Sequence, residues 1–253
     1  MARLDEMVAW LDDLLEPQAY ADYCPNGLQL PGPAEADRVV TGVSAGLELF
    51  ERAHRAGAGL VVVHHGLFWG TGPQAIDHLT FNRIRLLIDS GIALAAYHLP
   101  LDGHPEVGNN ALLAEAAGAD RREPFALHEG RPVGVIAEFD GGIGRDEFVG
   151  RITGATGGRE PLVFPSGPEV IERAGFVSGA GSSYLPDAVA EGLDAFVTGE
   201  PAERVMNESA EAAINFVAAG HYATETFGVR RLGELLGERF GVEHEFIDIP
   251  NPI

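Results

Sequence analysis

The sequence predicts an α/β protein built from two similar layered units. Strand-sized apolar runs alternate with amphipathic helical segments along most of the 253 residues, a pattern typical of helices packed on largely buried sheets. The two halves also have the same order of expected elements. Each holds a strand, a glycine-containing turn, a helix and a second glycine-bounded strand, at 39–66 and at 176–200. We interpret this shared order as a duplication and expect intertwined units at 1–120 and 121–253, with an approximate boundary.

The first unit opens with a helix at Leu4–Leu15, where apolar residues recur at helical spacing and Pro17 follows the last turn. Short Val- and Ala-rich runs then predict strands, and segments with apolar residues three and four positions apart predict helices. The expected elements are strand Val39–Val43, helix Glu48–Ala56, strand Leu60–Val63, helix Leu79–Ser90, strand Ile92–Tyr97 and helix Asn109–Ala117.

The middle of the chain, at about 120–170, contains clusters of glycine and proline, so we expect the crossing between the units there. The same periodicities predict the elements of the second half. The expected strands are Arg131–Phe139, Ala174–Ser178, Ala195–Thr198, Ile214–Ala219 and Glu243–Ile247, and the expected helices are Asp146–Thr153, Pro186–Glu191, Ala202–Ala210 and Ala223–Phe240.

The composition is strongly acidic and excludes several classes of function. The net charge is −21, and all 17 basic residues are arginines. Such a surface repels phosphates, so we expect no nucleic-acid partner, and the missing lysine excludes Schiff-base chemistry. No apolar run approaches the roughly 20 residues of a membrane span, and Met1–Glu6 begins an amphipathic helix rather than a secretory signal. We therefore expect a cytoplasmic protein without a membrane partner.

Histidine and carboxylate side chains gather at the ends of three predicted strands. The residues at these ends are His64 and His65, His98 and Asp102, and His221 and Glu225. Open α/β sheets place their sites at the carboxyl ends of strands, and imidazole and carboxylate ligands suit Zn, Fe, Mn or Ni without discriminating among them. The single cysteine, Cys24, excludes a cysteine-cluster site. The set predicts two adjacent divalent metal ions, with Asp102 and Glu225 as candidate bridging ligands.

Each of these candidate motifs also has an interpretation in which its residues are only structural. A histidine pair at a strand end is often structural, and a histidine followed four residues later by a carboxylate occurs often by chance. The segment 179–183 could hold a phosphate, although we favour a tight strand-to-helix turn. Phe68 and Trp69 could wall a cavity or stack a base, although we expect core packing. Surface or packing positions are expected for His54, His78, His104, His128 and His244.

Taken together, five motifs resemble the signatures of one family. They are Asn26–Gln29, His64–Trp69, Tyr97–Asp102, Thr198–Glu200 and Gly220–Glu225. The family is the dinuclear-metal-centre hexamer family, known as GTP cyclohydrolase I type II homologues and related to the NGG-one-interacting-factor-three-like proteins. The resemblance covers essentially the whole chain.

This resemblance implies a homohexamer of two-domain α/β subunits, with a metal pair that lies between the two units and faces an internal cavity. The implied metal ligands are His64, His65, Asp102, His221 and Glu225, with Glu225 bridging both ions. His98 and Glu200 match motif positions beside the site. We expect these two residues to transfer protons in catalysis or to support the ligands.

Two hypotheses on function follow. In the first, the protein is a metal-dependent hydrolase of a small, nucleotide-like substrate, and His98 or Glu200 moves the proton of a water activated by the metal pair. The family name implies opening of the GTP ring, although no motif in this sequence indicates guanine recognition. In the second, the protein stores, delivers or senses metal, or acts as a scaffold for partners, without catalysis.

The acidic composition also predicts a dependence of stability on salt. A net charge of −21 produces self-repulsion, which is screened when the Debye length shrinks to about 3 Å near 1 M salt. We therefore interpret the charge as an adaptation to a high-salt cytoplasm, whereas a GC-rich genome would explain the missing lysine alone. The melting temperature should rise between low and molar salt. A melting temperature that does not change with salt would contradict the halophilic interpretation.

Overall fold

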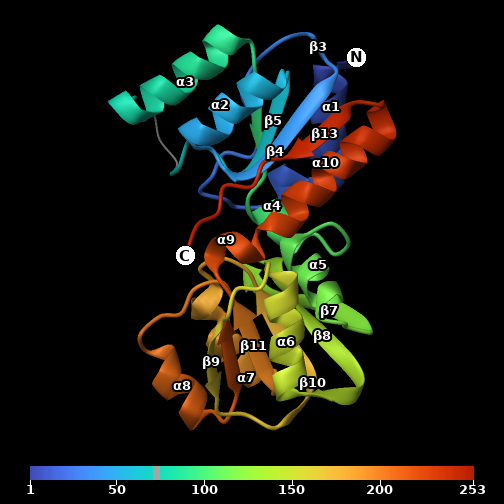
Figure 1. Ribbon diagram of the computed structural model, residues 1–253. Helices are drawn as coiled ribbons and strands as arrows, with labels where there is room; N and C mark the ends of the chain where they lie inside the picture. Colours follow the sequence, from blue (N-terminus) through green and yellow to red (C-terminus); the bar gives the residue numbers. More distant parts are fainter. Residues whose placement is uncertain (71–74) are drawn as a thin grey trace. The chain divides into compact units, whose positions relative to one another are not determined.

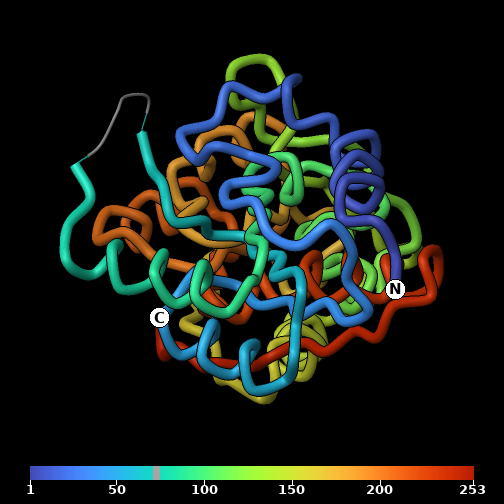
Figure 2. Tube along the Cα trace, turned by 90° about the horizontal axis from the view of Figure 1, so that it is seen from above, coloured from blue at the N-terminus to red at the C-terminus, as the bar shows by residue number. Residues whose placement is uncertain are grey.

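The computed structural model describes residues 1–70 and 75–253 and has the predicted α/β architecture (Figure 1). The chain forms two compact units. Unit 1 contains Met1–Leu101 and Gly228–Ile249, and unit 2 contains Asp102–Phe227 and Pro250–Ile253. The return of the C-terminal part of the chain to unit 1 can be followed by its red colour in Figure 2. The domain boundary predicted near residue 120 remains a prediction, since compact units and folding domains need not coincide.

Unit 1 is built on a five-stranded sheet. Its order is β13 (Glu243–Phe246), β4 (Arg38–Ser44), β5 (Leu60–His65), β6 (Ala93–Ala96) and β2 (Gly27–Leu30). The strands from β13 to β6 are parallel, and β2 is antiparallel to β6. A small two-stranded sheet joins β1 (Ala2–Arg3) and β3 (Glu35–Ala36).

Helices cover both faces of this sheet (Figure 1). The helices α2 (Leu47–Ala56) and α3 (His78–Ser90) lie on one side, and α1 (Leu4–Leu15) and α10 (Thr226–Phe240) lie on the other. Val61, Val62 and Val63 are all fully buried, as expected for a parallel strand covered on both faces. The buried strand β5 therefore carries His64 and His65 to the carboxyl end of the sheet.

Unit 2 is built on a six-stranded sheet. Its order is β7 (Arg121–His128), β8 (Arg131–Gly144), β10 (Val170–Val177), β11 (Ala195–Thr198), β12 (Asn215–Ala218) and β9 (Leu162–Pro165). The strands β10, β11 and β12 are parallel, and the other pairs are antiparallel. The helices of this part of the chain are α4 (Leu99–Gly103), α5 (Asn109–Ala116), α6 (Arg145–Ala155), α7 (Leu185–Ala190), α8 (Val205–Glu211) and α9 (His221–Thr224).

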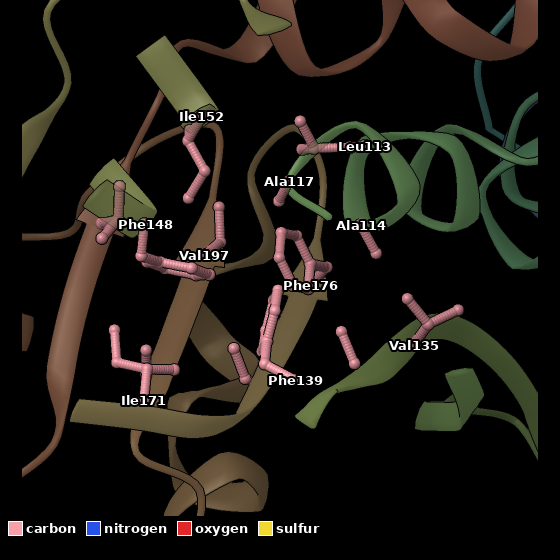
Figure 3. Packing of buried hydrophobic residues seen from close by; sticks show 14 of the residues in the cluster. Leu113, Ala114, Ala117, Val135, Phe139, Phe148, Ile152, Ile171, Phe176 and Val197 are labelled. Carbon is pink, nitrogen blue, oxygen red and sulfur yellow. The ribbon is translucent and has the colours of Figure 1, made fainter. Parts of the chain in front are cut away.

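The core of unit 2 lies between α5, α6 and one face of the sheet (Figure 3). Phe148 on α6 is fully buried, and its ring centroid lies 5.5 Å from that of Phe139 and 6.1 Å from that of Phe176. The opposite face carries Phe196 and Phe216, whose ring centroids are 6.0 Å apart, and the crossover helices α7 and α8 contact β11 and β12. Burial on both faces makes these strands continuous apolar runs.

The two sheets share a local topology. The order β4-β5-β6-β2 in unit 1 and the order β10-β11-β12-β9 in unit 2 each place three parallel strands in chain order, followed by an antiparallel strand from earlier in the chain. A short helix follows the third strand in both cases, α4 after β6 and α9 after β12. This correspondence supports the predicted shared order of elements, and the duplication itself remains an interpretation.

One expected helix differs from the structure. The helix predicted at Ala223–Phe240 begins earlier, at His221, and is interrupted at Glu225 between α9 and α10. The side chain of Thr224 donates a hydrogen bond to the Gly220 carbonyl (2.9 Å), a local bond that competes with a regular helical turn. The region at 120–170 forms β7, β8, α6 and β9, and the expected strand at 131–139 and helix at 146–153 lie within β8 and α6. The expectation that the chain crosses between the units in this region remains a prediction. Within the described ranges, each helix is too short or too polar to span a bilayer.

Candidate metal site

Three imidazoles meet at the carboxyl end of the sheet in unit 1. His64 and His65 end β5, and His98 follows β6. Their ring centroids lie 4.7 Å apart for His64 and His65, 4.9 Å for His64 and His98, and 5.7 Å for His65 and His98. One ring nitrogen from each residue lies within 4.8 Å of the others. These nitrogens are close enough to share one metal ion.

The other ring nitrogen of each histidine contacts a polar group of the protein. The Nδ1 of His64 lies 2.9 Å from the Tyr97 carbonyl oxygen, and the Nδ1 of His65 lies 3.0 Å from the Ser44 hydroxyl. A carbonyl can only accept, so the Nδ1 of His64 donates to it, which leaves the Nε2 as the nitrogen for a metal ion. Histidines that bind metals have this arrangement, in which the second nitrogen is held by a carbonyl, a carboxylate or water.

Asp22 holds the ring of His98 and was not singled out from the sequence. Its Oδ1 lies 2.9 Å from the Nδ1 of His98 and also accepts a hydrogen bond from the Cys24 amide (2.9 Å). Its Oδ2 accepts from the Leu99 amide (2.9 Å). Burial raises the pKa of the Asp22 carboxyl, but the hydrogen bond and charge of His98, with the other donors, outweigh it and lower the pKa to about 2. Asp22 is therefore a carboxylate that fixes His98.

The Asn26–Gln29 motif ties together the segments that carry the histidines. The side-chain oxygen of Asn26 accepts a hydrogen bond from the His98 amide (2.7 Å), and that of Gln29 accepts from the Leu67 amide (2.8 Å). A Cβ added at Gly66 would lie 2.2 Å from the Nε2 of Gln29, so the glycine allows this close approach. The polar motif therefore connects the ends of β5 and β6 by hydrogen bonds. This structural role accounts for its presence among the five family motifs.

Unit 2 brings together Asp102, His221 and Glu225. An oxygen of Asp102 lies within 4.8 Å of an oxygen of Glu225, although the two residues are only 7% and 3% exposed. The Nε2 of His221 lies 3.2 Å from the Oε2 of Glu225, and its Nδ1 contacts Glu200. Carboxylate oxygens and imidazole nitrogens are ligands of divalent metals, and Glu225 lies close to both of the other residues. The donor set of unit 2 therefore fits a divalent metal ion.

The imidazole of His221 is strongly basic in this arrangement. Burial alone lowers its pKa, but the hydrogen bonds and negative charges of Glu225 and Glu200 outweigh burial and raise the pKa of His221 to about 9. The ring therefore carries a proton at neutral pH in the metal-free protein. A metal bound at this ring would displace that proton, because only the unprotonated nitrogen is a ligand.

Asp102 is held by residues that the sequence reasoning missed. Ser178 and Asn109 each donate a side-chain hydrogen bond of 2.9 Å to its Oδ1. Asn110 accepts from the Ser178 amide (2.7 Å) and donates to the Val133 carbonyl (2.8 Å). The signal was present in the sequence, since two adjacent asparagines open a predicted helix and a serine ends a predicted strand. These hydrogen bonds fix the orientation of the Asp102 carboxyl group.

Gly179 provides the space that Glu225 occupies. A Cβ added at Gly179 would lie 2.2 Å from the Oε1 of Glu225 and 3.1 Å from the Nε2 of His221, and the residue has a φ of +59°. The Gly179 amide donates to the Thr224 hydroxyl (3.1 Å), and its carbonyl accepts from the Glu200 amide (2.8 Å). The segment then enters the short 3-10 helix η2 (Gly181–Tyr184). This turn therefore helps to position His221, Glu225 and Glu200.

The sequence matches the Duf34/NIF3 (NGG1p interacting factor 3) family over residues 2–252. The chain belongs to this family. A Vibrio cholerae protein named GTP cyclohydrolase 1 type 2 homolog is 42% identical over 250 residues, and a Pseudomonas aeruginosa protein of the same name is 40% identical over 249 residues. Both matches cover 98% of this chain and 98% of the relative. The solved structure of protein ybgI, whose function is given as unknown, has a TM-score of 0.92 at 38% identity and covers 99% of this chain and 100% of that chain.

In this Duf34/NIF3 chain, aromatic side chains lie beside the histidine cluster of unit 1. Trp69 is 36% exposed, and its ring centroid lies 5.7 Å from that of His65 and 5.2 Å from that of His98. Tyr23, which is 50% exposed, lies 5.4 Å from His98 and 6.1 Å from Trp69. The expectation that Trp69 packs in the core was therefore wrong. Its indole is available to a ligand at the surface of the cluster.

His244, His104 and Cys24 have local partners. The Nε2 of His244 lies 2.9 Å from the Thr41 hydroxyl, and the Nδ1 of His104 accepts hydrogen bonds from two amides that follow it in the chain. Cys24 is only 1% exposed, and burial raises the pKa of its thiol to about 11. An un-ionised, buried thiol is a poor nucleophile. These residues are packing or capping groups.

We expect Gly179→Ala to be more damaging than a substitution at a glycine of similar backbone conformation. Gly192→Ala is the matched control, because Gly192 has a φ of +65° and no atom within 4 Å of an added Cβ. The control should lose roughly 1–2 kcal/mol of unfolding free energy, whereas Gly179→Ala should lose roughly 2–4 kcal/mol because it also displaces Glu225. Denaturant titration measures both. Equal losses would contradict the close approach at Gly179.

Asp22 should make the stability of the folded protein depend on pH in the acidic range. Its pKa falls from 3.8 to about 2 in the folded protein, so its stabilising effect is full above about pH 4 and is lost as the pH falls toward 2. Asp22→Asn should cost about 2 kcal/mol at pH 7, and its difference from the unsubstituted protein should shrink over that range. Asp13→Asn, at an exposed position, is the control. A difference that persists unchanged at pH 2 would refute this role.

Proposed function

We propose that the protein binds two divalent metal ions and is a metal-dependent hydrolase of a small, nucleotide-like substrate. The proposed ligands are His64, His65, Asp102, His221 and Glu225, with Glu225 bridging both ions. The main support is the gathering of imidazole and carboxylate donors, since ring nitrogens of His64, His65 and His98 lie within 4.8 Å of one another, and so do oxygens of Asp102 and Glu225. Zn, Fe, Mn and Ni all accept imidazole and carboxylate ligands, so the donor set leaves the metal open.

The chemistry supplied by such a pair of ions would be activation of water and polarisation of a substrate oxygen. The protein's own groups would orient ligands and move protons. Glu200 contacts the Nδ1 of His221, which suits a residue that orients a ligand. The Nδ1 of His98 is held by Asp22 at 2.9 Å, so the Nε2 of His98 is the nitrogen that would take or give a proton. We propose these roles for Glu200 and His98.

The proposed substrate class rests on the aromatic side chains and on the names of the relatives. Tyr23 and Trp69 expose ring surface beside His98, and planar bases stack on such surfaces. Relatives at about 40% identity are named GTP cyclohydrolase 1 type 2 homolog, which favours a nucleotide-like substrate. Without lysine in the chain, a phosphate group would be met by arginine or by the metal ions.

We further propose that the protein forms a homohexamer and that it works in a cytoplasm with a high salt concentration.

A non-enzymatic role is the second candidate. His64 is fully buried, and Asp102 and Glu225 are almost fully buried. Ligands withdrawn from water also suit a protein that stores or delivers metal, or a scaffold stabilised by metal. The two proposals differ in turnover, because only the hydrolase requires a coordination position that is open to substrate.

Elemental analysis tests the metal site. Protein purified without chelator should contain about two ions per chain, and His64→Ala and Glu225→Ala should each lose most of the metal. His54→Ala, on the outer helix α2, is the control and should keep it. One tightly bound ion per chain would require a different ligand set, and no bound metal would refute the proposal.

Turnover separates the two candidate functions. Metal-loaded protein should hydrolyse at least one compound among nucleotides, phosphoesters and cyclic amides, and Glu225→Ala should abolish the reaction. His98→Gln should keep the metal but lower kcat by roughly 10²–10⁴-fold, because it removes proton transfer. Full metal loading with no turnover of any compound would favour storage or a scaffold.

A further inference from the structure

Arg159 brings a positive charge to the carboxyl end of the sheet in unit 2. It lies after α6, just before β9 begins at Leu162. β9 runs antiparallel to β12, and Leu162 pairs with Ala218 at the carboxyl end of β12. The chain that enters β9 therefore passes the end of β12, where Gly220 and His221 follow. This topology places an arginine beside a donor of the candidate metal site.

The Arg159 side chain packs against the backbone of Gly220. A Cβ added at Gly220 would lie 3.0 Å from the Nε of Arg159, 3.1 Å from its Cδ and 3.2 Å from its Cζ. Gly220 also has a φ of +101°, a backbone conformation that favours glycine. It is the residue that precedes His221 at the start of α9. The glycine therefore leaves room for a planar guanidinium against the peptide that leads into His221.

Most of the hydrogen-bonding capacity of this guanidinium is unused within the protein. A guanidinium has five N–H donors. Within residues 1–70 and 75–253, Arg159 donates one hydrogen bond, from its Nη1 to the Asn251 carbonyl at 3.5 Å, and forms no ion pair with a carboxylate. That distance is long for an N–H···O hydrogen bond. The side chain is partly exposed, so its remaining donors are available to a ligand.

Other arginines of unit 2 have carboxylate partners. The pairs, with their nitrogen–oxygen distances, are Arg151 and Glu147 (2.7 Å), Arg173 and Glu123 (3.2 Å), and Arg204 and Glu208 (3.4 Å). Carboxylates are abundant in this chain, which has 38 acidic and 17 basic residues. Arg159 therefore keeps a charge that local ion pairing does not use. Guanidinium groups bind phosphate oxygens through two parallel hydrogen bonds.

We propose that Arg159 binds a phosphate group of the substrate at the candidate metal site. Its neighbour His221 already contacts Glu200 and Glu225, and these negative charges repel an anion. The guanidinium offsets that repulsion and supplies the directed donors that lysine would supply in other proteins. The inference rests on the proposed function and deepens it, because it makes the substrate a phosphorylated compound and assigns a residue that selects it.

Calorimetric titration of the full chain with inorganic pyrophosphate at low salt tests this inference. Each protein is titrated once loaded with Mn²⁺ and once treated with a chelator. Arg159→Gln should raise the dissociation constant about tenfold or more, because charge-assisted hydrogen bonds are lost. Arg159→Lys should recover part of the affinity, since it keeps the charge without the fork of donors. Arg204→Gln is the matched control, because that side chain is 48% exposed and paired with Glu208, and it should keep the affinity.

Melting temperature and metal content separate ligand binding from a structural role. Both should be unchanged in Arg159→Gln, whereas a residue that only braced the Gly220 turn would change them. Four results would overturn the inference. They are an unchanged dissociation constant in Arg159→Gln, an equal loss of affinity in Arg204→Gln, a loss in Arg159→Gln that accompanies loss of metal, and no pyrophosphate binding to either form of the unsubstituted protein.

The same titrations distinguish failure of this inference from failure of the proposed metal site. Full metal loading with pyrophosphate affinity that Arg159→Gln does not change removes the role of Arg159 and leaves the metal site standing. A protein that holds no Mn²⁺ counts against the metal site. The titration of the chelator-treated protein then decides the role of Arg159 alone.

Discussion

The candidate site depends on the cost of burying charged and polar side chains away from water. A buried carboxylate or imidazole is tolerated when each of its polar atoms has a partner. Asp22 meets this condition with four donors, from His98, Cys24, Leu99 and Asn26. Asp102 and Glu225 have neighbouring donors but also lie close to each other. In the metal-free protein the protonated ring of His221 beside Glu225 offsets part of the repulsion between them, and a bound metal ion would replace that charge.

The two units orient a histidine ring in similar ways. In unit 1 the carboxylate of Asp22 holds the Nδ1 of His98, and in unit 2 the carboxylate of Glu200 holds the Nδ1 of His221. Both histidines come shortly after a parallel strand of their sheet, His98 after β6 and His221 after β12. The carboxylate four residues after each histidine, Asp102 or Glu225, is a different residue from the one at its Nδ1. The strand fixes the end point, and the following short helix turns the side chains.

The parts of the fold that were predictable are those in which periodicity and burial agree. The helix at Leu4–Leu15 and the strand Ala195–Thr198 were predicted with their observed bounds, because tertiary packing there follows the local pattern. The strands β2 and β7 were missed. β2 has only four residues, and β7 begins with Arg-Arg-Glu-Pro, so pairing with a neighbouring strand, rather than their own sequence, makes them strands.

The candidate site likewise contains residues that the sequence pattern reveals and residues that only the fold reveals. Histidines and acids at strand ends are visible in a sequence, because the strand pattern and the residue type both stand out there. Asp22 carries no such signal, since it lies in a loop 76 residues from His98 in the chain, and only the fold brings it there. Groups that act through long-range contacts must therefore be found in the structure. Long-range contacts hold one nitrogen of each histidine ring, as the Tyr97 carbonyl holds the Nδ1 of His64, and so decide which nitrogen at a strand end can bind a metal.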